Sequence, residues 1–278
     1  MATAIVFDSG VGGLSVFDCI AASLPGLRLV YVADNAYFPY GTKEESALVA
    51  RVRDLLVRLV ARHQPDLIVI ACNTASTVAL PAVRNALSLP IVGTVPAIKP
   101  AAQISATRVI GLLGTPGTVR RQYTQALIDE FAGDCTVLRH GSAELVELAE
   151  QKLRGEPVAP AAVKQALAGL LEQPGGERID TVVLACTHFP LLVAELTAAA
   201  PRPLRWIDSS EAIARRVASL LDGTAVFAPV ETPPQYRAIF TARTAEVERL
   251  RPALSLHGLA ETEFTEEWTG GSSVVNRP

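Results

Sequence analysis

Five short apolar runs constrain the fold of this 278-residue chain more than any other feature. They are rich in Val, Ile and Leu, and they are continuous rather than alternating, as expected for strands that are covered on both faces. Segments with helical spacing separate them, for example residues 43–63, where apolar residues recur every three or four positions. Strands that alternate with helices predict a parallel, doubly wound α/β sheet. The runs occupy residues 4–8, 28–33, 67–72, 108–113 and 181–186.

Two pairs of similar segments within the sequence predict two such α/β units. DLIVIACNT, from residue 66, and DTVVLACTH, from residue 180, share an Asp, an apolar run, Ala-Cys and two polar residues. IVFDSGVGG (5–13) and IGLLGTPGT (110–118) form a second pair, each a strand followed by a glycine-rich turn. We interpret PAIKPAAQ (96–103) as a linker, and we expect the tail at 270–278 to be disordered.

Composition narrows the class of protein. Hydrophobic residues make up 49% and charged residues 19%, and no apolar run approaches the roughly 18 residues of a membrane span. The opening MATAIVFDSG lacks the features of a secretory signal, which predicts a cytoplasmic protein. A net charge of −3 without a basic stripe disfavours nucleic acid as the primary partner. The four scattered cysteines are expected to be free thiols.

Three side chains are expected where ligands bind in open parallel sheets, beyond the carboxyl ends of strands: Asp8, Cys72 and Cys186. The turn DSGVGG presents backbone N–H groups that suit a carboxylate or a phosphate. CNTAS and CTH each place hydroxyl or amide donors beside a thiol. The pattern predicts an anion cradle with a thiol on each side.

Each of these residues also has a purely structural interpretation. A cysteine after an apolar strand is usually buried for packing, which is our interpretation of Cys19 and Cys135. Two cysteines that are each followed by polar donors favour a function instead. Asp8 could cap the following helix or serve Cys72 as a proton partner, and both alternatives stay open. His188 could be a surface histidine, but its position beside a thiol favours a role in forming a thiolate.

Together these motifs resemble those of the glutamate racemases, cofactor-independent members of the aspartate/glutamate racemase superfamily. The resemblance implies interconversion of L- and D-glutamate by deprotonation and reprotonation at Cα, without cofactor or metal, to supply D-glutamate for peptidoglycan synthesis. It leaves a homodimer open. The motifs occur in the family's order: FDSGVGGLSV (7–16), ADNAYFPYGTK (33–43), ACNTAS (71–76), VPAIKPA (95–101), GLLGTPGT (111–118) and ACTHFPLL (185–192).

The resemblance also assigns roles to single residues. Cys72 and Cys186 would be the catalytic acid/bases, facing the Cα proton of D- and L-glutamate respectively, with Asp8 and His188 assisting them. Glu150 matches a family glutamate near the site, but the preceding GSAE departs from the Cys-Pro common in relatives, so its role stays open. The residues expected to bind substrate are Asp8, Ser9, Tyr40, Gly41, Asn73, Thr74, Thr115, Thr118, Thr187 and His188.

Two thiols suit this reaction. A free thiol has a pKa of about 8.5, so a modest depression gives a thiolate near neutral pH while the partner thiol keeps its proton. The pair would share one proton, and its titrations would be coupled. Because no cofactor stabilises the carbanion, the turns around both thiols must stabilise charge on the substrate, which predicts a buried site at the junction of two domains.

The resemblance sets the expected domain boundaries. We expect a first α/β domain at 1–97 plus 209–265, a second similar one at 98–208, and a flexible tail at 266–278. Relatives that need a peptidoglycan precursor as activator tend to carry an N-terminal extension, and the first motif here begins at residue 7, which disfavours that control.

Other classes of function stay in competition. A nicotinamide-dependent oxidoreductase would use Gly10 and Gly12 with Asp34 as the ribose-binding acid, but this leaves both cysteine turns unexplained. A non-enzymatic amino-acid-binding protein has no use for two thiols. An aspartate racemase is the near alternative. A pyridoxal-dependent racemase would need one of Lys43, Lys99, Lys152 and Lys164, and a zinc site would draw on Cys72, Cys186 and His188.

Overall fold

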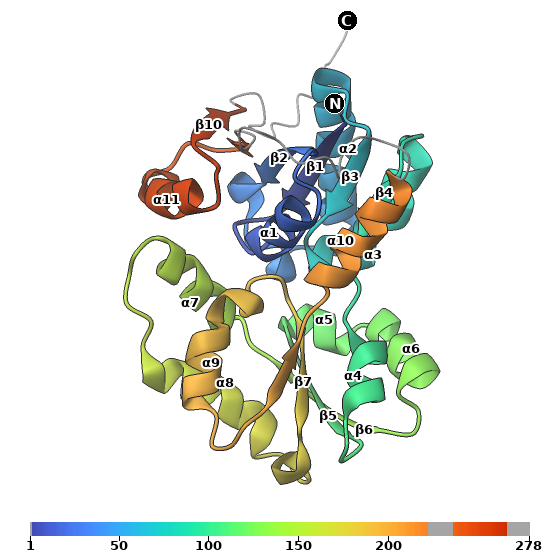
Figure 1. Ribbon diagram of the computed structural model, residues 1–278, viewed down its shortest axis with the longest axis vertical. Coiled ribbons are helices and arrows are strands. Elements are labelled where there is room, and N and C mark those ends of the chain that lie inside the picture. The colour runs from blue at the N-terminus through green and yellow to red at the C-terminus, as the bar shows by residue number, and fades with distance from the viewer. Residues whose placement is uncertain (1, 222–235, 266–278) are drawn as a thin grey trace, which may run out of the picture.

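The computed structural model describes residues 2–221 and 236–265, and within them the chain forms two parallel sheets (Figure 1). The larger sheet has the strand order β10-β9-β2-β1-β3-β4, and all its strand pairs are parallel. Its strands are β1 (Thr3–Asp8), β2 (Arg28–Ala33), β3 (Leu67–Ile70), β4 (Ile91–Gly93), β9 (Arg237–Phe240) and β10 (Glu261–Phe264).

The smaller sheet has the order β6-β5-β7-β8 and is also parallel throughout its described strands. Its central strands β5 and β7 are buried along their whole length, which accounts for their continuous apolar sequences. The predicted fold class, two parallel α/β domains, is confirmed. The strands are β5 (Val109–Gly114), β6 (Thr136–Gly141), β7 (Thr181–Ala185) and β8 (Arg205–Ile207).

Helices cover both faces of the larger sheet (Figure 1). One apolar core joins the sheet to α1 (Leu14–Ser23), α10 (Ser210–Leu220) and α11 (Ala245–Leu256). The opposite core joins it to α2 (Glu45–His63) and α3 (Asn73–Ala86). In α2 the apolar face of leucines and Val52 packs on the sheet, and the Glu44 side chain caps the first turn by accepting from two backbone N–H groups.

The smaller sheet is covered in the same way. One core contains side chains of α7 (Glu144–Leu153), α8 (Pro160–Leu171) and α9 (Val193–Ala199), and the other contains those of α4 (Ile98–Ile104), α5 (Pro116–Arg120) and α6 (Gln122–Phe131). Four 3₁₀ turns complete the described elements: η1 (Asn35–Tyr37), η2 (Tyr40–Thr42), η3 (Gly176–Arg178) and η4 (Phe189–Leu192).

The chain leaves the larger sheet after β4 and returns to it at α10. The two crossing segments touch, because the Ser209 hydroxyl donates a hydrogen bond to the Val95 carbonyl. The predicted domain boundaries, 1–97 plus 209–265 and 98–208, stay a prediction in their detail. The predicted flexible tail, 266–278, lies outside the described residues.

The five apolar runs became β1, β2, β3, β5 and β7, and the helical interpretation of 43–63 is confirmed by α2. The linker interpretation of 96–103 was wrong, because α4 occupies residues 98–104 and buries Ile98, Ala101 and Ala102 against the smaller sheet. Among the described residues, no helix is long and apolar enough to cross a membrane.

Asp34, directly after β2, ties several elements of the larger sheet together. Its buried carboxylate accepts hydrogen bonds from Nε and Nη2 of Arg51, both at 2.6 Å, and the Arg51 side chain is only 11% exposed. The hydroxyls of Tyr40 and Thr241 donate to the same carboxylate at 2.6 and 2.7 Å. One carboxylate therefore joins η2, α2 and the end of β9 to β2.

Asp34→Asn should destabilise the protein strongly, because it removes the negative charge from a buried carboxylate that pairs with the nearly buried Arg51 guanidinium. We expect a loss of about 3–5 kcal/mol in the free energy of unfolding, measured by urea denaturation followed by circular dichroism. Asp54→Asn is the matched control, because it removes an ion pair between two half-exposed side chains, Arg53 and Asp54. Its loss should be far smaller than that of Asp34→Asn, because water screens an exposed pair. Equal losses for the two variants would contradict the stabilising role of the Asp34 carboxylate.

Candidate active site

Two thiols from different sheets line one cavity. Cys72 lies two residues after the end of β3, at the N-cap position of α3, and Cys186 directly follows β7. Both are 6% exposed, and both line a cavity of about 240 Å³. The carboxyl ends of the two sheets thus meet at one place, where ligands bind in open α/β sheets.

Most residues predicted to bind substrate also line this cavity: Ser9, Tyr40, Gly41, Asn73, Thr74, Thr115, Thr187 and His188. Asp8 and Thr118 lie behind the wall. Thr118 is fully buried, and its hydroxyl is 2.9 Å from that of Thr115. Asp8 accepts a hydrogen bond from Ser9, so both residues support others that face the cavity.

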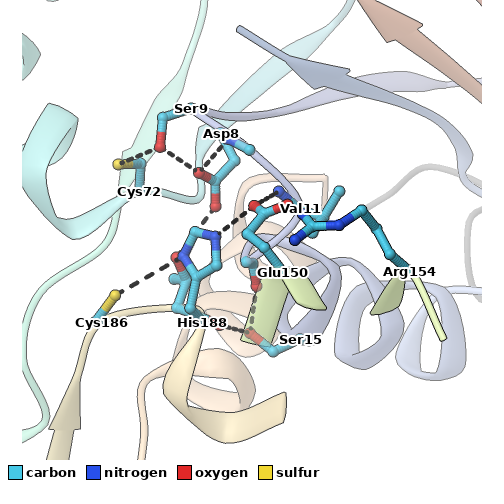
Figure 2. Close-up of polar contacts among 12 residues, drawn as sticks. Asp8, Ser9, Val11, Ser15, Cys72, Glu150, Arg154, Cys186 and His188 are labelled. Atoms are coloured by element: carbon cyan, nitrogen blue, oxygen red, sulfur yellow. Dashed lines mark hydrogen bonds and ion pairs between the residues drawn. The ribbon is translucent and has the colours of Figure 1, made fainter. Parts of the chain in front are cut away.

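Asp8 reaches the first thiol through Ser9 (Figure 2). The Ser9 hydroxyl donates to Asp8 Oδ1 at 3.0 Å and lies 3.8 Å from Cys72 Sγ. Burial raises the pKa of Asp8 above its ordinary value, although the charge of His188 and several hydrogen bonds oppose the shift. Burial, helped by the Asp8 charge, raises the pKa of Cys72 to about 12. Cys72 is therefore a protonated thiol in the ligand-free protein.

The second thiol has an imidazole beside it. His188 Nδ1 lies 3.9 Å from Cys186 Sγ, and His188 Nε2 lies 2.9 Å from Oε1 of Glu150 (Figure 2). Burial alone would lower the pKa of His188, but hydrogen bonds and charge interactions with Cys186 and Glu150 raise it well above the ordinary value. The imidazole therefore carries a proton at neutral pH and presents a positive charge to Cys186.

Two N–H groups of the glycine-rich turn after β1 donate to the protein's own carboxylates. The Gly10 N–H donates to Asp8 Oδ1 at 3.1 Å, and the Val11 N–H donates to Glu150 Oε1 at 3.1 Å. At these two N–H groups the protein's own carboxylates, Asp8 and Glu150 of α7, take the place expected for a ligand anion. Sequence reasoning left the role of Glu150 open, and the structure places this residue between the turn and His188.

Glycine is required in this turn for close approach. A Cβ atom added to Gly10 would lie 2.4 Å from Glu150 Oε1, and one added to Gly12 would lie 2.3 Å from His188 Nδ1. Such distances are sterically prohibited, and both neighbours are buried side chains. The two glycines therefore let the halves of the molecule approach until His188 and Glu150 fit between them.

The Asn73 side chain has no hydrogen-bond partner within residues 2–221 and 236–265. Its Nδ2 and Oδ1 atoms are both buried and make no hydrogen bond, although the residue lines the cavity at the start of α3. Buried amides are normally paired, so the unmet donor and acceptor indicate a polar ligand. Tyr40 differs from Asn73, because its hydroxyl already donates a hydrogen bond to Asp34. Tyr40 also lines the cavity.

Sequence reasoning missed part of the cavity wall. Phe38 and Pro39 lie within the motif ADNAYFPYGTK, which could have indicated them. Arg120 and Glu147 had no such signal, because helix periodicity marks them only as exposed positions. The missed lining residues are Phe38, Pro39, Thr42, Pro116, Arg120, Ala143, Val146 and Glu147.

The competing cofactor sites find little support in the geometry. All four lysines lie within the described residues, and none lines the cavity between the thiols. The Asp34 carboxylate, the predicted ribose-binding acid, is bonded to Arg51, Tyr40 and Thr241. Within residues 2–221 and 236–265, no cluster of three or more His, Cys, Asp or Glu side chains could hold a metal ion.

Comparison with known proteins gives consistent matches. The profile of the Asp/Glu/hydantoin racemase family matches residues 12–217. A glutamate racemase of Sphingopyxis alaskensis is 59% identical over 80% of this chain and 82% of its own. One of Klebsiella pneumoniae is 50% identical over 94% of this chain and 91% of its own. A crystal structure of Escherichia coli glutamate racemase with L-glutamate and the activator UDP-MurNAc-Ala is 48% identical, with a TM-score of 0.87 over 95% of this chain and 97% of that one.

Gly12→Ala should displace the His188 imidazole, because the new methyl group would overlap the ring. A displacement of about 1 Å is enough to lower catalysis roughly 100-fold. Racemisation of glutamate, followed by circular dichroism, measures this loss. Gly133→Ala is the control, because its added Cβ would meet one backbone oxygen of a described residue, at 3.2 Å, and Gly133 does not line the cavity. Full activity of Gly12→Ala would show that the close contact has no catalytic consequence.

Proposed function

Because the chain belongs to the glutamate racemases of the Asp/Glu/hydantoin racemase family, we propose that it interconverts L- and D-glutamate with two thiols that exchange one proton across Cα. Cys72 and Cys186 are the catalytic residues of this proposal. One observation supports the proposal most strongly: the two thiols, which follow strands of different sheets, line the same cavity. Racemisation requires proton removal on one face of Cα and proton return on the other, and two opposed thiols meet that need without turning the substrate.

The pKa shifts of Cys72 and His188 indicate the protonation states in which the proposed reaction begins. Cys72 begins as a thiol, since its pKa is about 12, and the protonated His188 stabilises negative charge on the Cys186 sulfur. With L-glutamate bound, the Cys186 thiolate takes the Cα proton and becomes a thiol. The C–H electron pair is delocalised onto the substrate carboxylate, and the Cys72 thiol then donates its proton to the opposite face. D-glutamate reacts by the reverse steps.

Charge on the substrate carboxylate must be stabilised by the protein, because no cofactor accepts it. Asn73 supports this role, because its amide, beside Cys72 at the start of α3, finds no hydrogen-bond partner in the described part of the chain. The Thr187 hydroxyl already donates to Asp8 Oδ2 at 3.1 Å, so its part is to fix Asp8 beneath the first thiol. Burial of the site excludes water and strengthens each of these interactions.

The substrate follows from the relatives, which carry the name glutamate racemase. Aspartate is one methylene shorter and remains the near alternative. We further propose that the product D-glutamate supplies peptidoglycan synthesis in the cytoplasm, as family membership implies. Incubation with each amino acid in turn decides between the two substrates.

Cys72→Ala and Cys186→Ala should each lower racemisation at least about 1,000-fold, the scale of a lost acid or base. The fold should persist, because replacing a thiol with hydrogen leaves little cavity. In deuterium oxide the wild type should label the product enantiomer at Cα while the remaining substrate keeps its proton, since each face has its own thiol.

Proton nuclear magnetic resonance of the separated enantiomers measures that labelling at low conversion. Early deuterium in the recovered substrate, or substantial turnover by either cysteine variant, would contradict the two-thiol mechanism. Labelling and turnover with aspartate rather than glutamate would keep the mechanism and change the substrate.

A further inference from the structure

A chain of alternating charges leads from the second thiol to the surface of the other domain. It begins at the sulfur beside the imidazole and continues through a carboxylate and a guanidinium (Figure 2). Each member lies within 4.0 Å of the next. In order, the members are Cys186, His188, Glu150, Arg154, Glu156, Arg249 and Glu246.

Arg154 stands at the centre of this chain. It caps the C-terminus of α7, where a positive charge is favoured, and its side chain is only 13% exposed. Its Nη1 lies 4.0 Å from Oε2 of Glu150, and its Nε donates to Oε1 of Glu156 at 3.0 Å. The guanidinium thus bridges the buried carboxylate behind His188 and a carboxylate nearer the surface.

Glu150 depends on such a partner. Its Oε1 atom accepts from the Val11 N–H and contacts His188 Nε2, so this oxygen is fully used. Its Oε2 atom faces Arg154. A buried carboxylate must be stabilised by hydrogen bonds or positive charge around both of its oxygens. Loss of the Arg154 cation would remove this stabilisation from Oε2, and Glu150 could then rotate away from the His188 imidazole.

The outer part of the chain crosses between the domains. Arg249 lies on α11, which packs on the larger sheet, whereas Glu156 follows α7 of the smaller one. Arg249 Nη1 and Arg154 Nε both lie 3.0 Å from the same oxygen, Oε1 of Glu156. The two cations therefore hold one carboxylate from opposite domains.

We propose that Arg154 is a positioning residue of the racemase reaction. It fixes Glu150 so that this carboxylate holds the His188 imidazole against Cys186. Through Glu156 and Arg249 the same cation ties this geometry to α11 of the other domain. The inference rests on the proposed two-thiol function and adds a residue that touches neither substrate nor thiol.

A double-mutant cycle tests the inner part. Arg154→Gln should lower kcat roughly tenfold and change KM less than about twofold, because the loss concerns the acid/base rather than ligand binding. Arg154→Lys, which keeps the charge, should retain most of the activity. In a Glu150→Gln background, Arg154→Gln should lower kcat by less than about a further twofold, since Arg154 acts through Glu150. Thermal unfolding of each variant, followed by circular dichroism, reports loss of fold separately.

Two arginines of α11 test the crossing between domains. Arg249→Gln should lower kcat about two- to threefold, a small effect because the pair is half exposed. Arg251→Gln is the matched control, since Arg251 pairs with Glu248 inside the same helix at 2.5 Å and should leave kcat unchanged. Both variants remove one exposed charge from one helix, so only the contact with Glu156 differs.

The outcomes separate this inference from the function on which it rests. If the wild type is active and Arg154→Gln has the same kcat, the inference is wrong and the proposed function stands. Losses that simply add in the Arg154 and Glu150 double variant would also overturn the inference, since these would indicate independent structural roles. Equal effects of Arg249→Gln and Arg251→Gln would overturn the link to α11. A wild type that racemises no amino acid would overturn the proposed function itself.

Discussion

The close contact between the glycine-rich turn after β1 and the pair His188 and Glu150 is the constraint on which the rest of the site depends. Gly10 and Gly12 have no side chain, so buried side chains from α7 and from the turn after β7 can lie where a Cβ would otherwise be. The turn then donates its Val11 N–H to Glu150. This contact holds the carboxyl ends of two sheets face to face, and the cavity between Cys72 and Cys186 follows from it.

The two thiols are similar in sequence context but differ in electrostatic environment. Cys72 has a buried carboxylate behind it, reached through Ser9, and a pKa of about 12. Cys186 has a protonated imidazole beside it, and the imidazole is backed by Glu150. A racemase operates near an equilibrium constant of one, so kcat/KM must be equal in both directions whatever the asymmetry of the free enzyme. In the mechanism that we propose, each thiol must therefore serve in turn as acid and as base.

The elements that could be predicted from sequence are those in which one physical requirement determines the residue types. Apolar runs such as residues 28–33 and 67–72 became buried strands because coverage on both faces demands continuous hydrophobicity. Both thiols were located for a related reason, since strand ends bind ligands in such sheets. Short strands such as β4 and β8, at three residues each, carry too little pattern to be recognised. The ion pairs through Arg154 and Arg249 were not predictable, because they join segments whose contact depends on the packing of two domains.

In the reaction that we propose, one bound amino acid lies between the Cys72 and Cys186 sulfurs. A crystal structure of the protein with D-glutamate measures this most directly, through the distances from each Sγ to the substrate Cα. We expect both sulfurs within roughly 4 Å of Cα, on opposite faces of the plane through its other substituents, close to the separation of reacting atoms. Glutamate bound with either sulfur well beyond that distance, or with both on the same face, would contradict the claim.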